Sequence, residues 1–159
     1  MSTLDPRPVS FAATQEAVAR CRRYRMENGL YGVVESPPAR IVLEAGPVGA
    51  VTMPVPLGKR VRALLLDHAR PSPIIGHLRS GRWTFLTGPV GAVVADEPLL
   101  ADLLHQGVDL ALPGARVVLP SPADESTGYR VWIEPPHGCD RPDLTAILAA
   151  TRACRAAHR

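Results

Sequence analysis

The spacing of apolar residues predicts a helix near each end of the chain. Over Phe11–Asn28, apolar and small side chains recur along one stripe with a helical period, and Gly29 follows as a stop signal. Over Asp143–His158, leucine, isoleucine, threonine and cysteine share one side of the predicted helix. We therefore expect an amphipathic helix at both ends. Residues 1–10 are expected to form a flexible lead that contains two prolines.

Short apolar runs between these helices predict β-strands. The first two runs flank the segment Ser36-Pro37-Pro38, which favours a hairpin-like connection between them. In the last run alternate residues are apolar, which is typical of a strand with one buried face. The runs are Tyr31–Glu35, Arg40–Ala45, Pro73–Leu78, Ala115–Leu119 and Tyr129–Glu134.

An internal repeat organises the middle of the chain. The hexapeptide Gly46–Val51 is identical to Gly88–Val93, 42 residues further on. Each copy follows a strand pattern and precedes a helical pattern that opens at a Pro-Leu pair. Both copies therefore predict a strand, a Gly-Pro turn, a second strand and a helix, and we expect the two units to superpose.

These patterns together predict an α+β fold. The chain has 159 residues, about the size of one ordinary domain. We expect a single domain over residues 11–159, built as a two-layer sandwich with terminal amphipathic helices. Its mixed sheet is expected to contain the duplicated unit.

Composition excludes several classes of protein. Hydrophobic residues make up 46% and charged residues 21%, which excludes a disordered chain. No apolar run is long enough to cross a bilayer, and residues 1–10 lack the basic and apolar parts of a secretory signal. Three cysteines are too few for a disulfide scaffold. The sequence therefore predicts a cytoplasmic protein without membrane association.

Arginine is the preferred cation of this chain. The formal net charge is +3, and 17 of the 18 basic residues are arginine. Arginine suits phosphate and carboxylate groups, but an Arg-, Ala- and Pro-rich composition is also what GC-rich codons produce. Aromatic residues, at 4%, are too scarce for an extended base-stacking platform. Charge and shape would therefore dominate the recognition of any nucleic acid.

Two basic segments and one strand arginine are the candidates for binding phosphate or an acidic partner. One segment lies near the end of the first helix, where its arginines also suit a solvated face. The other surrounds Ser80-Gly81, and the alternative there is a hairpin turn with Trp83 in the core. The candidates are Arg20, Arg22, Arg23, Arg25, His77, Arg79, Arg82 and Arg130.

The other motifs contain no complete catalytic centre. Neither Gly-Pro-Val-Gly copy has the spacing of a phosphate-binding loop, so both are interpreted as tight turns. Asp96-Glu97 precedes Pro98 and suits a helix N-cap with a first-turn acid. Asp124-Glu125 suits a solvated turn. No serine has a neighbouring base in the sequence that would activate it.

A weak candidate for zinc binding occurs near the C-terminus. His137, Cys139, Cys154 and His158 follow the pattern H-x-C-x14-C-x3-H, and zinc takes these ligand types. Cys154 also completes the apolar stripe of the last helix, and free cysteine commonly behaves as a small buried hydrophobe. We therefore expect no metal and no other cofactor.

Two segments resemble the N-terminal domain of bifunctional DNA primase/polymerases. Thr87–Pro98 resembles that family's Thr-Gly, apolar strand and Asp-x-Asp-Pro segment. Leu119–Trp132 is similar to its Pro-Ser, Gly and Tyr-x-Trp stretch. The resemblance assigns Asp96 and Glu97 to binding of divalent cations, and Ser121 to the nucleotide site. The chain also resembles small Arg- and Ala-rich accessory proteins of high-GC actinobacteria.

The chain departs from this family at the positions that matter for polymerase chemistry. Asp96 and Glu97 are adjacent, whereas the family separates its two acids by one residue, and neighbours on a strand point to opposite faces. Pro122 and Ala123 stand where the family has a phosphate-binding histidine. The resemblance therefore implies a degenerate relative that keeps the sheet and a polyanion-binding surface without the active site.

Three functions remain open from the sequence. The leading hypothesis is a non-catalytic binding or regulatory domain that engages nucleic acid or an acidic protein through its arginines. The alternatives are a nucleotide-handling enzyme of the primase/polymerase type and a protein-interaction module stabilised by zinc. The oligomeric state does not follow from the sequence.

Overall fold

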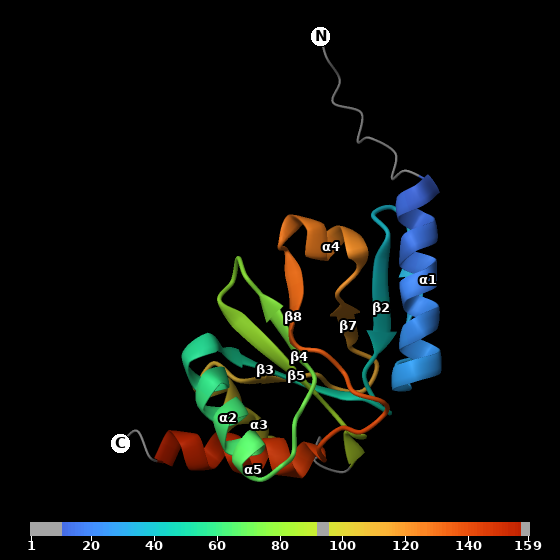
Figure 1. Cartoon of the computed structure of the whole chain (residues 1–159). Helices are drawn as coiled ribbons and strands as arrows, with labels where there is room; N and C mark the ends of the chain where they lie inside the picture. The colour runs from blue at the N-terminus through green and yellow to red at the C-terminus, as the bar shows by residue number, and fades with distance from the viewer. Residues whose placement is uncertain (1–10, 92–95, 157–159) are drawn as a thin grey trace.

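The computed structural model describes residues 11–91 and 96–156 as five helices and eight strands in two open sheets (Figure 1). The α+β class predicted from the sequence is confirmed. The expected flexible lead lies outside the described residues, and so does His158. Among the described helices, none is both long enough and apolar enough to span a membrane.

The elements agree closely with the sequence pattern. α1 ends where predicted, and Gly29 takes the positive φ, 61°, that a residue after a helix favours. The helices are α1 (Phe11–Asn28), α2 (Val55–Asp67), α3 (Glu97–His105), α4 (Pro122–Thr127) and α5 (Leu144–Ala156). The strands are β1 (Val33–Glu35), β2 (Arg40–Glu44), β3 (Gly49–Pro54), β4 (Ile74–His77), β5 (Arg82–Thr87), β6 (Asp109–Leu110), β7 (Arg116–Leu119) and β8 (Arg130–Glu134).

Two antiparallel sheets form the framework. One has the strand order β1-β2-β7, and the other has the order β6-β3-β5-β4-β8. Every pairing between described strands is antiparallel, so the expectation of a mixed sheet is wrong. The β1–β2 and β4–β5 neighbours follow directly from short connections, because parallel neighbours would need long crossovers.

Residues 40–54 pair with residues 109–119 as one antiparallel ribbon that runs through both sheets. The Ala45 N–H donates to the Ala115 carbonyl at 2.8 Å, just beyond the β2–β7 pairing. The Ala111 N–H donates to the Ala50 carbonyl at 2.9 Å, just beyond the β3–β6 pairing. β2 thus continues into β3, and β6 continues into β7. The first Gly-Pro segment, at Gly46, is the bend between the sheets and does not close a hairpin.

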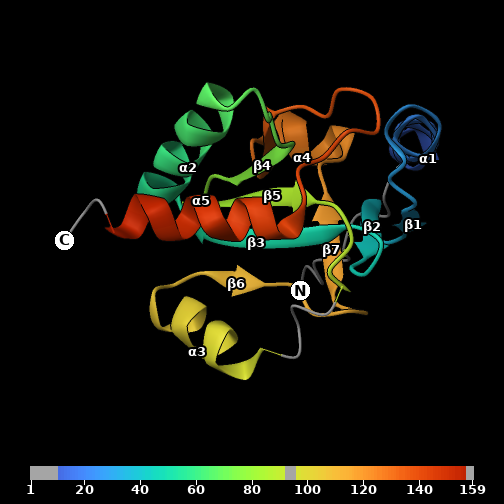
Figure 2. The same ribbon diagram turned by 90° about the horizontal axis from the view of Figure 1, so that it is seen from below.

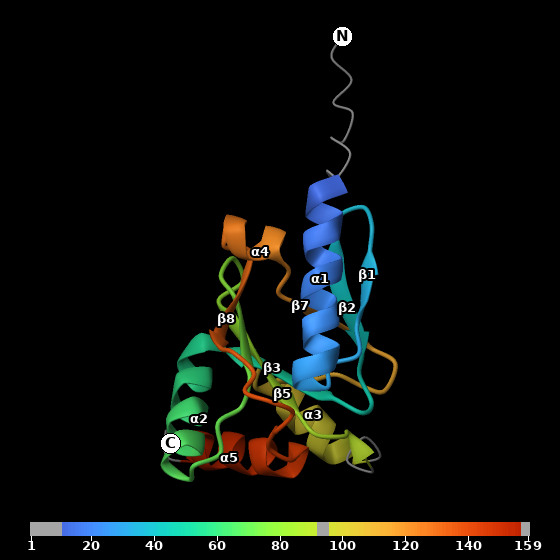
Figure 3. The ribbon, with the colours of Figure 1, turned by 45° about the vertical axis from the view of Figure 1, so that its right-hand side comes forward.

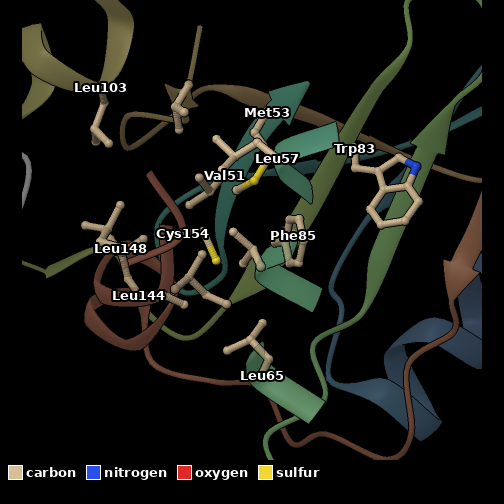
Figure 4. Packing of buried hydrophobic residues seen from close by; sticks show 14 of the residues in the cluster. Val51, Met53, Leu57, Leu65, Trp83, Phe85, Leu103, Leu144, Leu148 and Cys154 are labelled. Carbon is tan, nitrogen blue, oxygen red and sulfur yellow. The ribbon is translucent and has the colours of Figure 1, made fainter. Parts of the chain in front are cut away.

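The larger core lies between the five-stranded sheet and the helices α2 and α5 (Figures 2 and 4). Val51, Met53 and Phe85 project from alternate strand positions onto this face and are fully buried. Leu57 and Val61 repeat at helical spacing on α2 and pack against them. Each such side chain contributes about 1.5–3 kcal/mol of hydrophobic free energy on burial.

A second core fills the space between the two sheets. Ala50, Ile75 and Leu86 face away from α2 and α5, and they belong to one cluster with Leu43 and Leu119 of the three-stranded sheet. α1 packs along the three-stranded sheet on the far side of the molecule from α5 (Figures 1 and 2). The five-stranded sheet is therefore covered on both faces.

The two identical hexapeptides adopt different conformations. Gly46 has a φ of 151° and Gly91 has a φ of 60°, whereas their counterparts Gly88 and Gly49 have no positive φ. The copies also contact each other, because the Gly49 N–H donates to the Gly88 carbonyl at 3.0 Å. Our expectation that the two turns superpose is therefore wrong. The second strand expected in the later copy falls on residues 92–95, outside the described residues.

Candidate anion-binding site

A pocket of about 230 Å³ lies between the two sheets. Strands of the five-stranded sheet supply one wall, and β7 with the residues before it supplies the other. The pocket is lined by Ala50, Thr52, His77, Thr84, Ala111, Arg116, Val117, Val118 and Arg130. The lining thus contains two arginines, Arg116 and Arg130, and one histidine, His77. It contains no aspartate or glutamate.

A chain of hydrogen bonds crosses the sheet side of the pocket. Thr52 and Thr84 are directly opposite each other in the β3–β5 pair, so their side chains share one face. Their hydroxyl oxygens lie 2.7 Å apart, and His77 Nε2 lies 2.8 Å from the Thr84 hydroxyl. Because strand residues alternate between faces, this polar face is the reverse of the one that carries Trp83 and Phe85. The chain therefore holds the imidazole at a defined position.

Arg130 brings a nearly buried guanidinium to the pocket. Its side chain is 12% exposed, and its Nη1 donates to Asp124 Oδ2 at 3.3 Å. Its guanidinium carbon lies 4.6 Å from the centre of the Tyr129 ring. The Nε of Arg130 is buried and has no hydrogen-bond partner among the described residues.

Arg116 supplies the second guanidinium from the opposite wall. Its side chain is exposed and forms an ion pair with Glu35 of β1. Glu35 does not line the pocket, so the carboxylate neutralises Arg116 from outside. Arg116 and Arg130 thus belong to different sheets and line the same pocket.

The electrostatic environment of His77 is positive. Burial lowers the pKa of His77, and the charges of Arg130 and Arg82 lower it further. Arg82 is fixed beside the pocket, because its Nη2 donates to the Gly107 carbonyl at 2.7 Å and to Asp109 Oδ2 at 3.1 Å. A lowered pKa keeps the imidazole neutral near pH 7 in the free protein. A nearby anion would have the opposite effect.

The β4–β5 hairpin confirms the alternative that the sequence offered for this segment, a hairpin turn with Trp83 in the core. Trp83 is only 7% exposed and belongs to the larger core. Arg79 stays at the exposed hairpin end, with its guanidinium carbon 5.0 Å from the centre of the Tyr129 ring. The structure therefore groups His77, Arg82 and Arg130 around the pocket, and it places Arg79 outside the lining.

The four arginines of α1 do not reach this pocket. Arg20 forms two hydrogen bonds to the Glu125 carboxylate, at 2.6 and 3.1 Å, and this contact raises the pKa of Arg20. Arg25 donates to the Gly32 carbonyl at 2.8 Å. Arg22 and Arg23 are exposed, and neither forms an ion pair with a described residue. None of the four α1 arginines therefore lines the pocket.

Two of the three residues assigned by the family resemblance, Asp96 and Ser121, act as helix caps. The Asp96 carboxylate accepts a hydrogen bond from the Leu99 N–H at 3.0 Å at the start of α3, as the sequence predicted, and Glu97 is exposed in the first turn. Ser121 is 1% exposed, and its hydroxyl accepts from the Asp124 N–H at 3.1 Å in a capping box. The side chains of Asp96 and Ser121 are therefore engaged in local structure.

The acidic pair Asp124-Glu125 does not form the solvated turn that we expected. Both residues lie in the first turn of α4, a short helix that the sequence analysis missed. Asp124 pairs with Arg130, and Glu125 pairs with Arg20. α4 has no apolar stripe, because none of its residues is buried, so hydrophobic periodicity could not indicate it. Ser121 and Gly128 were the available signals.

The cysteine and histidine residues considered for zinc are dispersed. Cys154 is buried in the larger core, and Cys139 is exposed with its Sγ 3.7 Å from the Glu27 carbonyl. His137 is exposed, 3.6 Å from Glu134. His158 lies outside the described residues. Across residues 11–91 and 96–156, no three His, Cys, Asp or Glu side chains are grouped as a metal site would require.

Two other cavities are less suited to a charged ligand. A cleft of about 350 Å³ between the segments 69–73 and 134–143 is lined by charges of both signs, including Arg70, Arg141 and Asp140. A groove of about 560 Å³ between α2 and α5 is lined mainly by leucine and alanine. Neither combines several cations with the exclusion of carboxylates.

Fold and site together define an α+β protein with two antiparallel sheets and a cationic pocket between them. Comparison with models of protein families, with curated proteins and with solved structures finds no significant match to this chain.

Proposed function

We propose that this chain is a non-catalytic binding domain that takes a phosphate group of a nucleotide or nucleic acid into the pocket between the sheets. The observation that supports this proposal is the convergence of Arg116, Arg130, His77 and two threonine hydroxyls on one pocket that no carboxylate lines. Guanidinium groups match the geometry of phosphate oxygens, and hydroxyls add further donors.

The size of the pocket favours binding of a single phosphate group over binding of a whole nucleotide. Pockets that enclose a small molecule measure roughly 300–1,000 Å³, and this one is about 230 Å³. A terminal phosphate fits such a space while the rest of the ligand stays outside. The resemblance to primase/polymerase domains agrees with this ligand class, because that family handles nucleotides.

The non-catalytic part of the proposal is supported by the use of the acidic residues. Asp96 is engaged as the cap of α3, and Asp124 and Glu125 are engaged in ion pairs. Phosphoryl transfer needs metal ions held by carboxylates beside the phosphate. The pocket lining contains no carboxylate side chain.

Fluorescence anisotropy with short single-stranded DNA tests the proposal. An oligonucleotide with a 5′-phosphate should bind more tightly than the same oligonucleotide with a 5′-hydroxyl, and inorganic pyrophosphate should compete. Arg116→Gln should weaken binding of the phosphorylated strand about tenfold, because it removes one charge-assisted hydrogen bond. Arg79→Gln removes the same charge outside the pocket and should have little effect.

Either of two results would contradict this function. Equal affinity for the phosphorylated and unphosphorylated strands would exclude recognition of a terminal phosphate. Equal losses for Arg116→Gln and Arg79→Gln would show that general positive charge, and not the pocket, binds the ligand.

A further inference from the structure

The outer face of α1 and β1 exposes an unusual share of apolar side chains. Among the residues that the structure describes, nine large hydrophobic residues are exposed, and five of them lie on α1, on β1 or between them. These five are Phe11, Val18, Met26, Tyr31 and Val33. α1 runs beside β1 at the edge of the three-stranded sheet (Figure 3). Of these five, Val18 and Val33 line one groove, and exposed apolar side chains that lie close together are typical of an interaction surface.

A groove of about 320 Å³ lies between α1 and β1. Val18, Arg22 and Arg25 form the helix wall, since positions four and seven residues apart share one stripe of a helix. Val33 and Val34 form the strand wall. The groove is therefore apolar on the strand side and cationic on the helix side.

The floor of the groove is held firmly. The Gly32 carbonyl accepts hydrogen bonds from Arg25 Nη2 at 2.8 Å and from Arg25 Nε at 3.2 Å. The buried Cys21 thiol also donates to this carbonyl, at 3.3 Å. These contacts fix Arg25 beside the strand, so the guanidinium is positioned before any partner binds.

The strand wall is also a sheet edge. β1 pairs with β2 on one side, and no described strand pairs with its other side. An edge strand presents backbone N–H and C=O groups that an incoming extended segment can pair with. A helix beside such an edge forms a groove in which the side chains of the added strand can lie.

The charge of this surface selects an acidic occupant. Arg22 and Arg23 have no ion-pair partner among the described residues, and Arg25 contacts only a neutral carbonyl. Arg20, by contrast, is neutralised by Glu125. The helix side of the groove therefore has an excess of positive charge, which attracts a ligand of opposite sign.

We propose that this groove binds an extended acidic segment of a protein partner, which adds to the free edge of β1. The segment places carboxylates against Arg22 and Arg25 and apolar side chains against Val18 and Val33. A protein segment is favoured over nucleic acid because the sheet edge and the exposed valines match a peptide backbone and apolar side chains. This inference is independent of the phosphate pocket and concerns a separate surface.

Nuclear magnetic resonance with a designed probe tests this inference on the full chain. The probe is a blocked hexapeptide of alternating glutamate and valine, and the matched control probe replaces glutamate with lysine. The acidic probe should shift the Val33 and Val34 amide signals with a Kd of about 1 mM or lower. Arg22→Gln should weaken this binding about fivefold, because it removes a partly desolvated charge pair.

Arg23→Gln is the matched control variant, since Arg23 is exposed on the same helix but does not line the groove. It should leave the affinity for the acidic probe unchanged. The inference is overturned if neither valine amide shifts at millimolar acidic peptide, or if the lysine probe binds equally well. It is also overturned if single-stranded DNA shifts these amides at lower concentration, or if β1 pairs with a second copy of the chain.

Discussion

Tyr24 connects three parts of the molecule through one hydroxyl group. The hydroxyl donates to the Pro120 carbonyl at 2.6 Å and accepts from Trp132 Nε1 at 3.0 Å. The rings of Tyr24 and Trp132 meet edge to face, with centroids 5.9 Å apart. Burial of the phenol raises the pKa of Tyr24, so the group stays a neutral donor. α1, the segment before α4, and β8 are therefore tied together by this residue.

Tyr24→Phe should lower the free energy of unfolding by about 1–3 kcal/mol, because it leaves a buried carbonyl and an indole N–H without a partner. Urea denaturation followed by circular dichroism measures this change. Tyr31→Phe is the control, since Tyr31 is 73% exposed, and it should change stability by less than about 0.5 kcal/mol. Equal stability of the two variants would refute the role assigned to Tyr24.

Among the elements, the first Gly-Pro bend depends on close contact between the two copies of the repeat. A Cβ added at Gly49 would lie 2.2 Å from Thr87 Oγ1 and 3.0 Å from the Gly88 carbonyl. Gly91, its counterpart in the other copy, has open space around it and a φ of 60°. The same residue type is therefore required for space at one position and for conformation at the other.

Gly49→Ala should lower the free energy of unfolding by about 1–3 kcal/mol, because β3 or β5 must shift to relieve the overlap. Gly91→Asn should cost less, about 1 kcal/mol or below, since asparagine tolerates a positive φ. Thermal unfolding of both variants makes the comparison. A larger loss for Gly91→Asn than for Gly49→Ala would mean that the copies do not pack in this way.

Sequence patterns predicted elements whose signals are local. The period and stop of α1 and the two prolines between β1 and β2 lie within the segments that they define. The pairing of β2 with β7 and of β3 with β6 joins residues more than fifty positions apart, and no local pattern indicates it. The prediction of a mixed sheet was wrong for this reason. The prediction that the two turns superpose was wrong because identical hexapeptides can occupy different tertiary environments.

The whole molecule determines which candidate residues meet. His77 was predicted as part of the segment around Ser80-Gly81 and Arg130 as a separate strand arginine, and the structure brings the two to one pocket. Thr52, Thr84 and Arg116 were not predicted, because they are ordinary strand residues until β3, β5 and β7 are placed together. Alternation alone could have put the two threonines on one face, but only strand pairing sets them opposite each other.

The salt dependence of DNA binding distinguishes a pocket from an extended basic surface. If two arginines contact phosphate, the logarithm of affinity for single-stranded DNA should fall with the logarithm of salt concentration with a slope of roughly −1.4. Anisotropy titrations over a range of salt concentrations measure the slope. A slope steeper than about −4 would contradict the pocket, because it requires many more phosphate contacts than the pocket arginines supply.

The titration of His77 tests the account most directly. In the free protein, burial and the charges of Arg130 and Arg82 lower the pKa of His77. A phosphate in the pocket adds negative charge beside the imidazole, which favours the protonated form and must raise this pKa. By linkage, phosphate then binds more tightly as pH falls through the range in which His77 takes up a proton.

Proton nuclear magnetic resonance of the histidine rings, recorded against pH with and without pyrophosphate, makes the measurement. His77→Gln assigns the signal, and the ring signals of the exposed His137 serve as the control for non-specific effects of pyrophosphate. The account predicts that saturating pyrophosphate raises the pKa of His77. A His77 titration curve that is the same with and without pyrophosphate would contradict a phosphate site between the two sheets.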